Sequence, residues 1–520
     1  MPKTYHNLSL ELDQDLAEQL QWLEPNYSSF HILRQSVDAR RGKNPRLIYS
    51  VEIFGAEESP PPPPAPLERL KHWKEAPVLV VGTGPAGLFA ALRLLERGIP
   101  CVIFEQGSEA TERLKRINRF WRYGELDPRN NVGFGEGGAG LYSDGKLITR
   151  IKSPHIPYVM RRLVEFGAPE EILYLSNPHV GSDRIRRVIP KLRQRLLDLG
   201  GQIHFNTKVT ELLLDSSPTP AQIKGLEVED GRRFLSERVI LACGHSSEDM
   251  FAHLHQVGVY MESKAFAVGL RVEHPQQLIN QIQYRSLADH PKLGAANYKL
   301  AYHNKEDDRG IYSFCMCPGG YVLSSGTEPT GLVSNGMSNY NRGSAFANAA
   351  IVVSLQPNTS EGLFAGLRYR RELEARALSL ITSQQGTKEL PAQRLVDFLD
   401  KRSGPALKSS CPSGVLPARL DQLMGEDLSR QLQLGLEKFN RSMRGFITPE
   451  AQFHGVESRT SCPLRITRDP ESLESLSHQG LFPCGEGAGY AGGITSAACD
   501  GIRIAEKIYS QVVSIRSRAL

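Results

Sequence analysis

Three glycines and one glutamate have the types and the spacing of a dinucleotide-binding site. Gly82, Gly84 and Gly87 follow a short apolar run, and Glu105 closes the next one. The first glycine allows a tight turn, the second lets a pyrophosphate approach the backbone, and the third lets a helix pack closely on the strand. A helix that begins near Pro85 would direct free N–H groups at the phosphates. The glutamate would accept hydrogen bonds from ribose hydroxyls and would repel a 2′-phosphate.

Two further stretches, 135–140 and 487–492, match the glycine pattern but lack the strand, helix and distal acid around it. The first overlaps a segment that can pass close to a flat ring and offer backbone donors. Its residues are Gly137, Gly138, Ser143 and Gly145. The alternative for both stretches is a set of ordinary tight turns.

Cys315 and Cys317 place two thiols on one predicted strand. The segment 311–323 has the pattern of a hairpin that turns at Pro318-Gly-Gly. Alternate residues of a strand share a face, so both thiols and Ser313 would face a cofactor or substrate together. The alternative is two small buried hydrophobic residues beside a turn. A disulfide would require the strand to bend, and the scattered positions of the other cysteines predict no metal site.

The elements that must position these residues divide the chain into five segments. Residues 1–56 predict a small βαββ module, and the proline-rich residues 57–75 predict a semi-rigid linker. Residues 76–264 and 456–520 predict the two parts of a Rossmann-like nucleotide-binding domain. Residues 265–455 predict an α+β substrate domain inserted between them. The expected fold class is therefore α/β.

Within the nucleotide-binding parts, residues 201–209 predict one strand that leads into a small antiparallel meander. A strand over 480–486 and a closing helix over 495–511 complete the second part.

Arg271 and Arg459 lie where the inserted domain is expected to meet the nucleotide-binding domain. Either could bind a carboxylate or phosphate of a substrate, although a structural ion pair is the alternative for both. His245 and His274 could transfer protons near neutral pH.

Composition agrees with a large enzyme. The chain has 520 residues, of which 40% are hydrophobic, and a formal net charge of +5, which argues against nucleic acid as the partner. No apolar run is long enough to span a membrane, and no leader pattern precedes the first strand. Eight cysteines without a paired framework suit a reducing compartment, so we expect a cytoplasmic protein.

Several motifs together resemble the two-dinucleotide-binding, glutathione-reductase-like flavoproteins. Within that superfamily, the chain most resembles a family catalogued as uncharacterised FAD-dependent dehydrogenases. The motifs that carry this resemblance are residues 36–40, 131–147, 314–320, 334–337 and 485–493. The spacing of Cys315 and Cys317 differs from that of the redox cysteines of disulfide reductases, which lie in the nucleotide domain.

The resemblance implies that the dinucleotide is FAD. It also implies that Val209 contacts the adenine end through its backbone, that the double glycine at 137–138 lies near the isoalloxazine ring, and that Glu486 contacts the ribityl chain where relatives have an aspartate. The closing helix, with Ile494 at its start, would stabilise negative charge on reduced flavin. The complete set of expected FAD contacts is Gly82, Gly84, Pro85, Ala86, Gly87, Glu105, Gln106, Gly137, Gly138, Ser143, Gly145, Val209, Gly244, Gly485, Glu486, Gly492, Gly493 and Ile494.

The first functional hypothesis is an FAD-dependent oxidoreductase whose partner is a small-molecule substrate or an external electron carrier. No second strand-glycine-helix-acid unit is present in the inserted segment, so NAD(P)H would act only as a transient electron donor. The second hypothesis is a nucleic-acid-associated, RNA-modifying flavoprotein that uses the basic stretches 40–46 and 113–122. The third is a non-enzymatic FAD-binding scaffold or sensor. The sequence does not indicate the oligomeric state.

Overall fold

The structure is a computed structural model that describes residues 2–40, 43–62, 64–357 and 359–518. Arg41 and Gly42 of the basic stretch 40–46, and Pro63 of the linker, lie outside the described residues.

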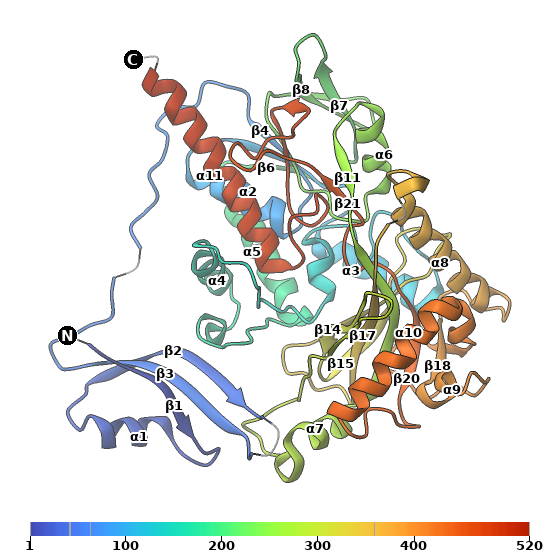
Figure 1. The fold of residues 1–520 in the computed structure, drawn as a ribbon. Helices are drawn as coiled ribbons and strands as arrows, with labels where there is room; N and C mark the ends of the chain where they lie inside the picture. Colours follow the sequence, from blue (N-terminus) through green and yellow to red (C-terminus); the bar gives the residue numbers. More distant parts are fainter. Residues whose placement is uncertain (1, 41–42, 63, 358, 519–520) are drawn as a thin grey trace.

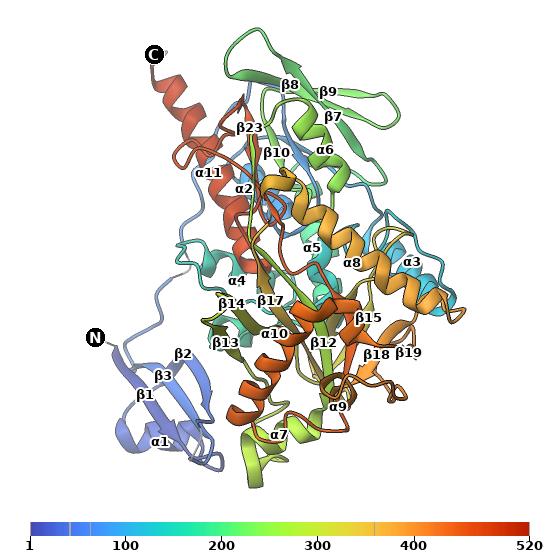
Figure 2. The same cartoon turned by 45° about the vertical axis from the view of Figure 1, so that its right-hand side comes forward.

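The N-terminal residues form a small antiparallel sheet with one helix. In chain order the elements are β1 (Lys3–Leu10), α1 (Leu16–Leu23), β2 (Ser29–Asp38) and β3 (Arg46–Phe54). The strand order is β1-β3-β2, and the Asp15 side chain caps α1. The module stands to one side of the body in Figures 1 and 2, and the backbone of Gln35 attaches it there by hydrogen bonds with Tyr174 and Ser176.

A five-stranded parallel sheet in the order β23-β10-β4-β5-β6 forms the centre of the nucleotide-binding half. Its strands are β4 (Val78–Val81), β5 (Cys101–Phe104), β6 (Gln202–His204), β10 (Val239–Leu241) and β23 (Leu481–Pro483). Because the strands are buried on both faces, alternate residues of β4 pack into two different hydrophobic cores, one on each side of the sheet. Val78 and Val80 pack against the helices, and Leu79 and Val81 pack toward the meander.

Six helices and two short 3-10 helices belong to this half of the described chain. They are α2 (Pro85–Glu96), α3 (Ala110–Tyr123), η1 (Gly138–Tyr142), α4 (Ile156–Glu165), η2 (Glu170–Leu173), α5 (Ser182–Asp198), α6 (Glu248–Gln256) and α11 (Ile494–Arg518). Although α2 and α11 are far apart in the sequence, they lie side by side in Figures 1 and 2.

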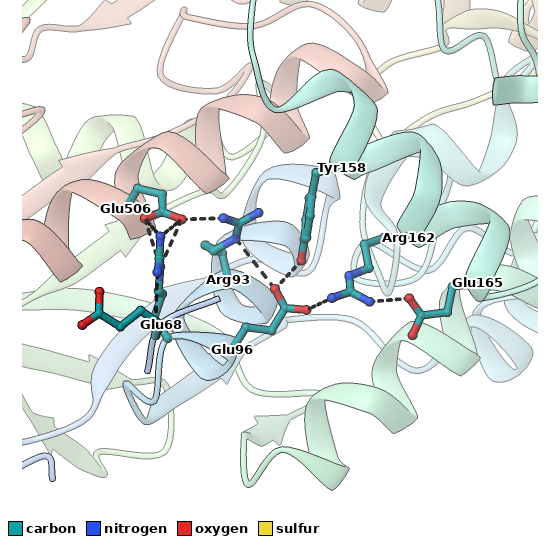
Figure 3. A network of polar contacts seen from close by, with 8 residues as sticks. Glu68, Arg93, Glu96, Tyr158, Arg162, Glu165 and Glu506 are labelled. Atoms are coloured by element: carbon teal, nitrogen blue, oxygen red, sulfur yellow. Dashed lines mark hydrogen bonds and ion pairs between the residues drawn. The ribbon is translucent and has the colours of Figure 1, made fainter. Parts of the chain in front are cut away.

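An ion-pair network fixes this helix pair, as Figure 3 shows. Glu506 of α11 accepts hydrogen bonds from Arg93 of α2 and from Arg97, the residue that follows the end of α2. Glu96 continues the network to Arg162 of α4, with an N–O distance of 2.5 Å. The C-terminal helix is thereby attached to the helix that follows the glycine turn.

The predicted strand 201–209 is in fact two strands, and this corrects the sequence interpretation. Asn206 has a φ of 51°, and its amide donates to the carbonyl of Gly107. The left-handed residue ends β6 and redirects the chain into a separate sheet. The strands of that sheet are β7 (Val209–Asp215), β8 (Ala221–Val228), β9 (Arg233–Leu235) and β22 (His478–Gln479).

The inserted segment is built on a seven-stranded sheet in the order β13-β14-β17-β12-β20-β18-β19. Its strands are β12 (Phe266–Pro275), β13 (Ala301–Asn304), β14 (Arg309–Cys317), β17 (Phe346–Leu355), β18 (Leu390–Arg394), β19 (Val415–Pro417) and β20 (Gln452–Glu457). Its helices are α7 (Gln276–Tyr284), η3 (Arg285–Leu287), η4 (Thr359–Glu361), α8 (Ala365–Thr382), α9 (Leu395–Leu399) and α10 (Leu420–Ser442). One face of the sheet packs into an apolar core with α8 and α10.

The other face carries buried polar residues and is turned toward the nucleotide-binding half. Arg271, Glu273 and Asn348 project from this face, because Arg271 and Glu273 are two residues apart in β12 and Asn348 of β17 lies directly opposite Glu273. A buried ion pair between Arg370 of α8 and Glu248 of α6, 2.6 Å long, joins the two halves directly.

The predicted hairpin at Pro318 does not form. After β14 the chain leaves the large sheet, and β15 (Gly320–Ser324) pairs with β16 (Ser334–Ser338) in a separate two-stranded ribbon. A further small pair, β11 (Met261–Ser263) with β21 (Leu464–Ile466), joins the stretches of chain that precede and follow the inserted segment. β14 instead pairs with β13 and β17, so its end is free to bend toward the other half.

None of the helices among the described residues is both long enough and apolar enough to cross a membrane.

Candidate cofactor and substrate site

A cavity of about 410 Å³ lies between the two halves of the molecule. Its wall includes the turn after β4, the end of β5, the loop 133–148, the turn after β10 and the start of α11. The inserted segment contributes Phe314, Cys315 and Asn335, and the residues that directly follow it contribute Glu457, Arg459 and Thr460. The cavity therefore connects the predicted dinucleotide site with the predicted substrate domain.

The glycine turn has the geometry that its residue types predict. Gly82 has a φ of 102°, which disfavours any other residue. A Cβ on Gly87 would lie 2.0 Å from the carbonyl oxygen of Gly82, so only glycine allows this close packing of helix on turn. A Cβ on Gly84 would meet no protein atom within 4 Å, because it would point into the cavity.

The first turn of α2 begins at this open position. Gly84 is its N-cap and Pro85 its first residue, and no side chain caps the helix. The first amides of a helix lack partners within the helix, and the helix dipole makes this end positive. The turn is therefore a site for an anionic group such as a pyrophosphate.

Glu105 lies at the cavity wall but is committed to the protein backbone. Its Oε2 accepts hydrogen bonds from the amide and hydroxyl of Thr83, at 3.0 and 2.6 Å. Its Oε1 accepts from the amides of Gly107 and Gly135, at 3.0 and 3.1 Å. These four bonds fill the acceptor positions of a carboxylate. The predicted ribose contact stays a prediction, and the contacts present show that Glu105 holds the glycine turn and the loop 133–148 together.

Arg113, which the sequence analysis assigned to a basic stretch, holds the glycine-rich loop in place. It is fully buried, and its guanidinium donates to the carbonyls of Asn131, Val132, Glu136 and Gly138 at 2.7 to 3.0 Å. It thereby shapes the glycine-rich loop that passes the cavity. The neighbouring basic residues are paired with acids: Lys115 and Arg116 with Glu112, and Arg119 with Glu125.

Most of the expected FAD contacts line the cavity. These are Gly82, Gly84, Pro85, Ala86, Glu105, Gln106, Gly138, Ser143, Val209, Gly244, Glu486, Gly492, Gly493 and Ile494. Four other expected contacts do not line the cavity: Gly87, Gly137, Gly145 and Gly485. They act through packing, since a Cβ on Gly137 would meet Leu141 at 2.0 Å and one on Gly145 would meet the amide of Gly181 at 2.7 Å.

The part of the cavity near the inserted segment carries titratable side chains. Burial raises the pKa of Glu486 to about 7, and Cys315 raises it further while Lys264 opposes the shift. Burial lowers the pKa of His245 to about 3, assisted by Arg370 and Arg459. His245 is therefore neutral near pH 7, whereas Glu486 can hold or release a proton there.

Arg459 faces the cavity with one of its nitrogens. Nε and Nη2 bind the carboxylate of Glu374 at 3.0 and 2.7 Å. Nη1 donates to the hydroxyl of Ser246, which lines the cavity, and to the hydroxyl of Thr327.

Two candidate residues lie away from the cavity, which corrects the sequence interpretation. The Arg271 side chain is fully buried and bound to Glu457 and Asn348, so it cannot clamp a substrate. His274 is also fully buried, its ring bonded to the carbonyl of Phe446, and burial lowers its pKa to about 4. They lie on opposite faces of β12: Arg271 contacts Glu457 behind the cavity wall, and His274 packs against Phe446.

The two thiols do not share one strand face as predicted. Phe314 pairs with Ala350 and Cys317 with Asn348, so β14 holds one residue more than β17 between these pairs. This β-bulge takes the two thiols off a common face of the strand, although the residues stay close together. Cys315 reaches the cavity wall, and Cys317 is buried behind it.

Two families match parts of the chain. The family described as FAD binding domain matches residues 75–116, and the one described as FAD-dependent protein, C-terminal domain-like, matches residues 265–460. A protein of Clostridium beijerinckii, described as an uncharacterized protein, is 38% identical over 529 residues, which cover 97% of this chain and 98% of that one. The chain belongs to this family of FAD-dependent proteins. Its cofactor is FAD.

More distant similarities cover less of the chain or have lower identity. A thiamine thiazole synthase of Pyrobaculum calidifontis is 27% identical over 194 residues, 35% of this chain and 61% of that protein. Among solved structures, CtdE in complex with FAD covers 85% of this chain and 92% of its own, with 13% identity and a TM-score of 0.30. The L-proline dehydrogenase from P. horikoshii covers 86% and 95%, with 12% identity and a TM-score of 0.35.

The residues of this FAD-dependent protein fit the cofactor. Gly84, Gly244 and Gly492 are open to the cavity, since a Cβ on any of them would meet no protein atom within 4 Å. The uncapped start of α2 suits the pyrophosphate, and the start of α11 at Ile494 offers a second positive helix end.

Sequence reasoning missed several residues that hold this site, chiefly Thr83, Arg113 and Lys146. Lys146 lines the cavity, and its ammonium donates to the carbonyl of Met316 across the boundary between the halves. No pattern signals such a residue, because the contact joins segments far apart in the chain. No group of three metal-ligating side chains was found in the ranges that the structure describes.

Proposed function

We propose that this protein is an FAD-dependent oxidoreductase that acts on a small molecule held over the flavin between the two halves. One observation carries the proposal: the cavity extends from the glycine turn after β4 to Cys315 of the inserted segment and to Glu457 and Arg459, which directly follow that segment. A cofactor-binding scaffold would not require polar and titratable groups at that place.

FAD supplies the transfer of two electrons when bound. The protein binds it through Gly82, Gly84 and the start of α2, and positions the substrate against it. Arg459 would place its positive charge beside an anionic group of the substrate, and its hydrogen bonds to Glu374, Ser246 and Thr327 hold the guanidinium in place. Glu486 is the group that holds or moves a proton near neutral pH.

Electron flow in either direction, as a dehydrogenase or a reductase, is compatible with this arrangement. We also propose that NAD(P)H acts as a transient electron donor and that an external carrier can accept the electrons. The basic stretch 113–122 does not favour nucleic acid, because Arg113 is buried and three of its neighbours are ion-paired.

The test is an anaerobic titration of the purified holoprotein, followed at the flavin absorbance maximum at about 450 nm. NADH, NADPH and a panel of metabolites are added in turn. Rapid bleaching by a nicotinamide makes the protein a reductase, and bleaching by a metabolite alone makes it a dehydrogenase. A bound flavin that no donor can reduce would support a scaffold and contradict the proposal.

A further inference from the structure

The end of β14 is strained where it meets the cavity. Cys315 has a φ of 44°, in the left-handed region that residues other than glycine, asparagine and aspartate rarely adopt. It lies in the β-bulge between Phe314 and Cys317. Such a backbone conformation is unfavourable and persists where surrounding contacts impose it, often at functional sites.

Contacts from both halves of the molecule impose this conformation. Lys146, from the nucleotide-binding half, donates to the carbonyl of Met316, the residue between the two cysteines. Arg271, from β12, places Nη1 3.4 Å from the carbonyl oxygen of Cys315. The Cys317 thiol donates to that same oxygen at 3.3 Å. The bulge thus brings the two cysteine residues together, which an extended Cys-x-Cys strand would not do.

The two thiols differ in access and in charge. Cys315 is partly exposed and lines the cavity, whereas Cys317 is fully buried. A hydrogen bond from Cys317 lowers the pKa of Cys315, and the charges of Arg271 and Lys146 lower it further against the effect of burial. The same hydrogen bond raises the pKa of Cys317. The pair therefore holds an accessible thiolate beside a protonated partner.

This environment is particular to Cys315 among the eight cysteines, all of which lie in the described residues. Burial raises the pKa of each of the six others outside the pair. Four of them reach about 11 to 12: Cys101, Cys243, Cys411 and Cys462. Those thiols are inert by comparison, because the thiolate is the reactive form.

We propose that Cys315 and Cys317 are a redox-active dithiol that reduces small-molecule disulfides in the cavity. The Cys315 thiolate attacks one sulfur of the substrate; a bond forms between them, the substrate S–S bond breaks, and one thiolate leaves and takes a proton. Cys317 then loses its proton and attacks the Cys315 sulfur. The Cys315–Cys317 disulfide forms, the second substrate thiol leaves with a proton, and two electrons have passed from the protein to the substrate.

The return to the dithiol rests on the proposed function. Reduced FAD is the two-electron donor that restores both thiols, with protons taken up from the medium. Glu486, which also lines the cavity and whose pKa the Cys315 thiolate raises, is placed to exchange a proton there.

The test is a chemical map of the cysteines rather than an activity assay. The reduced holoprotein is incubated without oxygen with 2-hydroxyethyl disulfide, quenched in acid, alkylated with N-ethylmaleimide and digested. We expect the peptide that contains both cysteines to have lost two hydrogens and to resist alkylation. A Cys317→Ser variant should retain the mixed disulfide on Cys315, and a Cys315→Ser variant should form neither product. Cys411→Ser is the matched control, because Cys411 is buried away from the cavity wall, and it should give the wild-type yield.

A second measurement needs no variant. The rate of alkylation of each wild-type cysteine is followed against pH, and Cys315 should react at least tenfold faster than the other seven at pH 7. Equal rates, or an intact dithiol after excess disulfide, would overturn the proposal.

The two proposals can fail separately. If a donor bleaches the flavin but no Cys315–Cys317 disulfide forms, the dithiol proposal is wrong and the oxidoreductase stands. If the disulfide forms but no donor reduces the flavin, the dithiol stands and the oxidoreductase proposal is wrong.

Discussion

The guanidinium of Arg271 and the carboxylate of Glu457 form a buried, two-pronged ion pair behind the cavity wall. Nε donates to Oε2 at 3.0 Å and Nη2 donates to Oε1 at 2.8 Å. Arg271 is fully buried, and Glu457 is 4% exposed. Because Glu457 also lines the cavity, the pair fixes a charged group at the boundary between the sheet and the site.

Replacing only the cation should strongly destabilise the protein. Arg271→Met leaves the Glu457 carboxylate buried without its main partner, which should lower the free energy of unfolding by about 3–5 kcal/mol. Denaturant unfolding monitored by circular dichroism measures the change. The double variant Arg271→Met/Glu457→Gln should recover most of the loss, since no unpaired charge remains. Equal stability of the single and double variants would show that the ion pair is not responsible.

Alanine substitutions at two neighbouring glycines should affect different properties: FAD affinity at Gly84 and stability at Gly87. Gly84→Ala adds a methyl group that points into the cavity, so the apoprotein should fold normally while its affinity for FAD falls at least tenfold, or about 1.4 kcal/mol. Gly87→Ala adds a methyl group that would lie 2.0 Å from the Gly82 carbonyl oxygen, so it should lower stability itself, by about 1–3 kcal/mol. Fluorescence titration with FAD and thermal unfolding of the apoproteins separate the two effects. If Gly84→Ala binds FAD like the wild type, the phosphate site is elsewhere.

Glu486 should make the stability of the apoprotein depend on pH. Burial raises its pKa from 4.5 to about 7. The folded state therefore binds the proton more tightly than the unfolded state between these values, and the free energy of unfolding falls as the pH rises through this window. Above about pH 7 the penalty is constant.

Glu486→Gln should remove this penalty. We expect it to be about 2 kcal/mol more stable than wild type at pH 8, less than the full shift implies because the side chain is 28% exposed, and equally stable at pH 4. Thermal unfolding of the apoproteins at both pH values measures the difference. Glu237→Gln, at an exposed site, should differ from the wild type by less than about 0.5 kcal/mol. A Glu486→Gln protein that is less stable at pH 8 would contradict the buried-carboxyl interpretation.

The network in Figure 3 predicts a salt-dependent contribution from the C-terminal helix. Glu506→Gln removes the carboxylate that binds Arg93 and Arg97, and should cost about 1–2 kcal/mol because this side chain is only 22% exposed. The loss should shrink in high salt. Glu165→Gln, whose carboxylate pairs with Arg162 but is 47% exposed, should cost less than about 0.5 kcal/mol. Similar costs for both variants would show that α11 is not held by its ion pairs.

The sequence was most informative where function depends on local backbone shape. The turn with Gly82, Gly84 and Gly87 needs glycine for reasons confined to a few residues, so its strand, turn and helix could be predicted together. The mixed α/β fold and the FAD cofactor followed from such local patterns and from the resemblance that they carried, and both are confirmed.

Tertiary structure decided the roles of residues whose partners are far away in the chain. Arg271 and His274 had the types of catalytic residues, but the packing on the two faces of the large sheet buries both side chains completely. Arg113 belonged to a basic stretch, but the glycine loop folds over it. Local spacing carries no information on such long-range packing.

The strand that contains Cys315 shows this limit most clearly. Alternation along a strand predicted that both thiols face one way, which holds only for a regular strand. Whether one residue bulges depends on its register with β17 and on a lysine from the other half of the molecule. The sequence by itself determined that two thiols are close in the chain. Only the tertiary structure decided that one thiol faces the cavity while the other is buried, because contacts that form when the two halves meet stabilise the bulge.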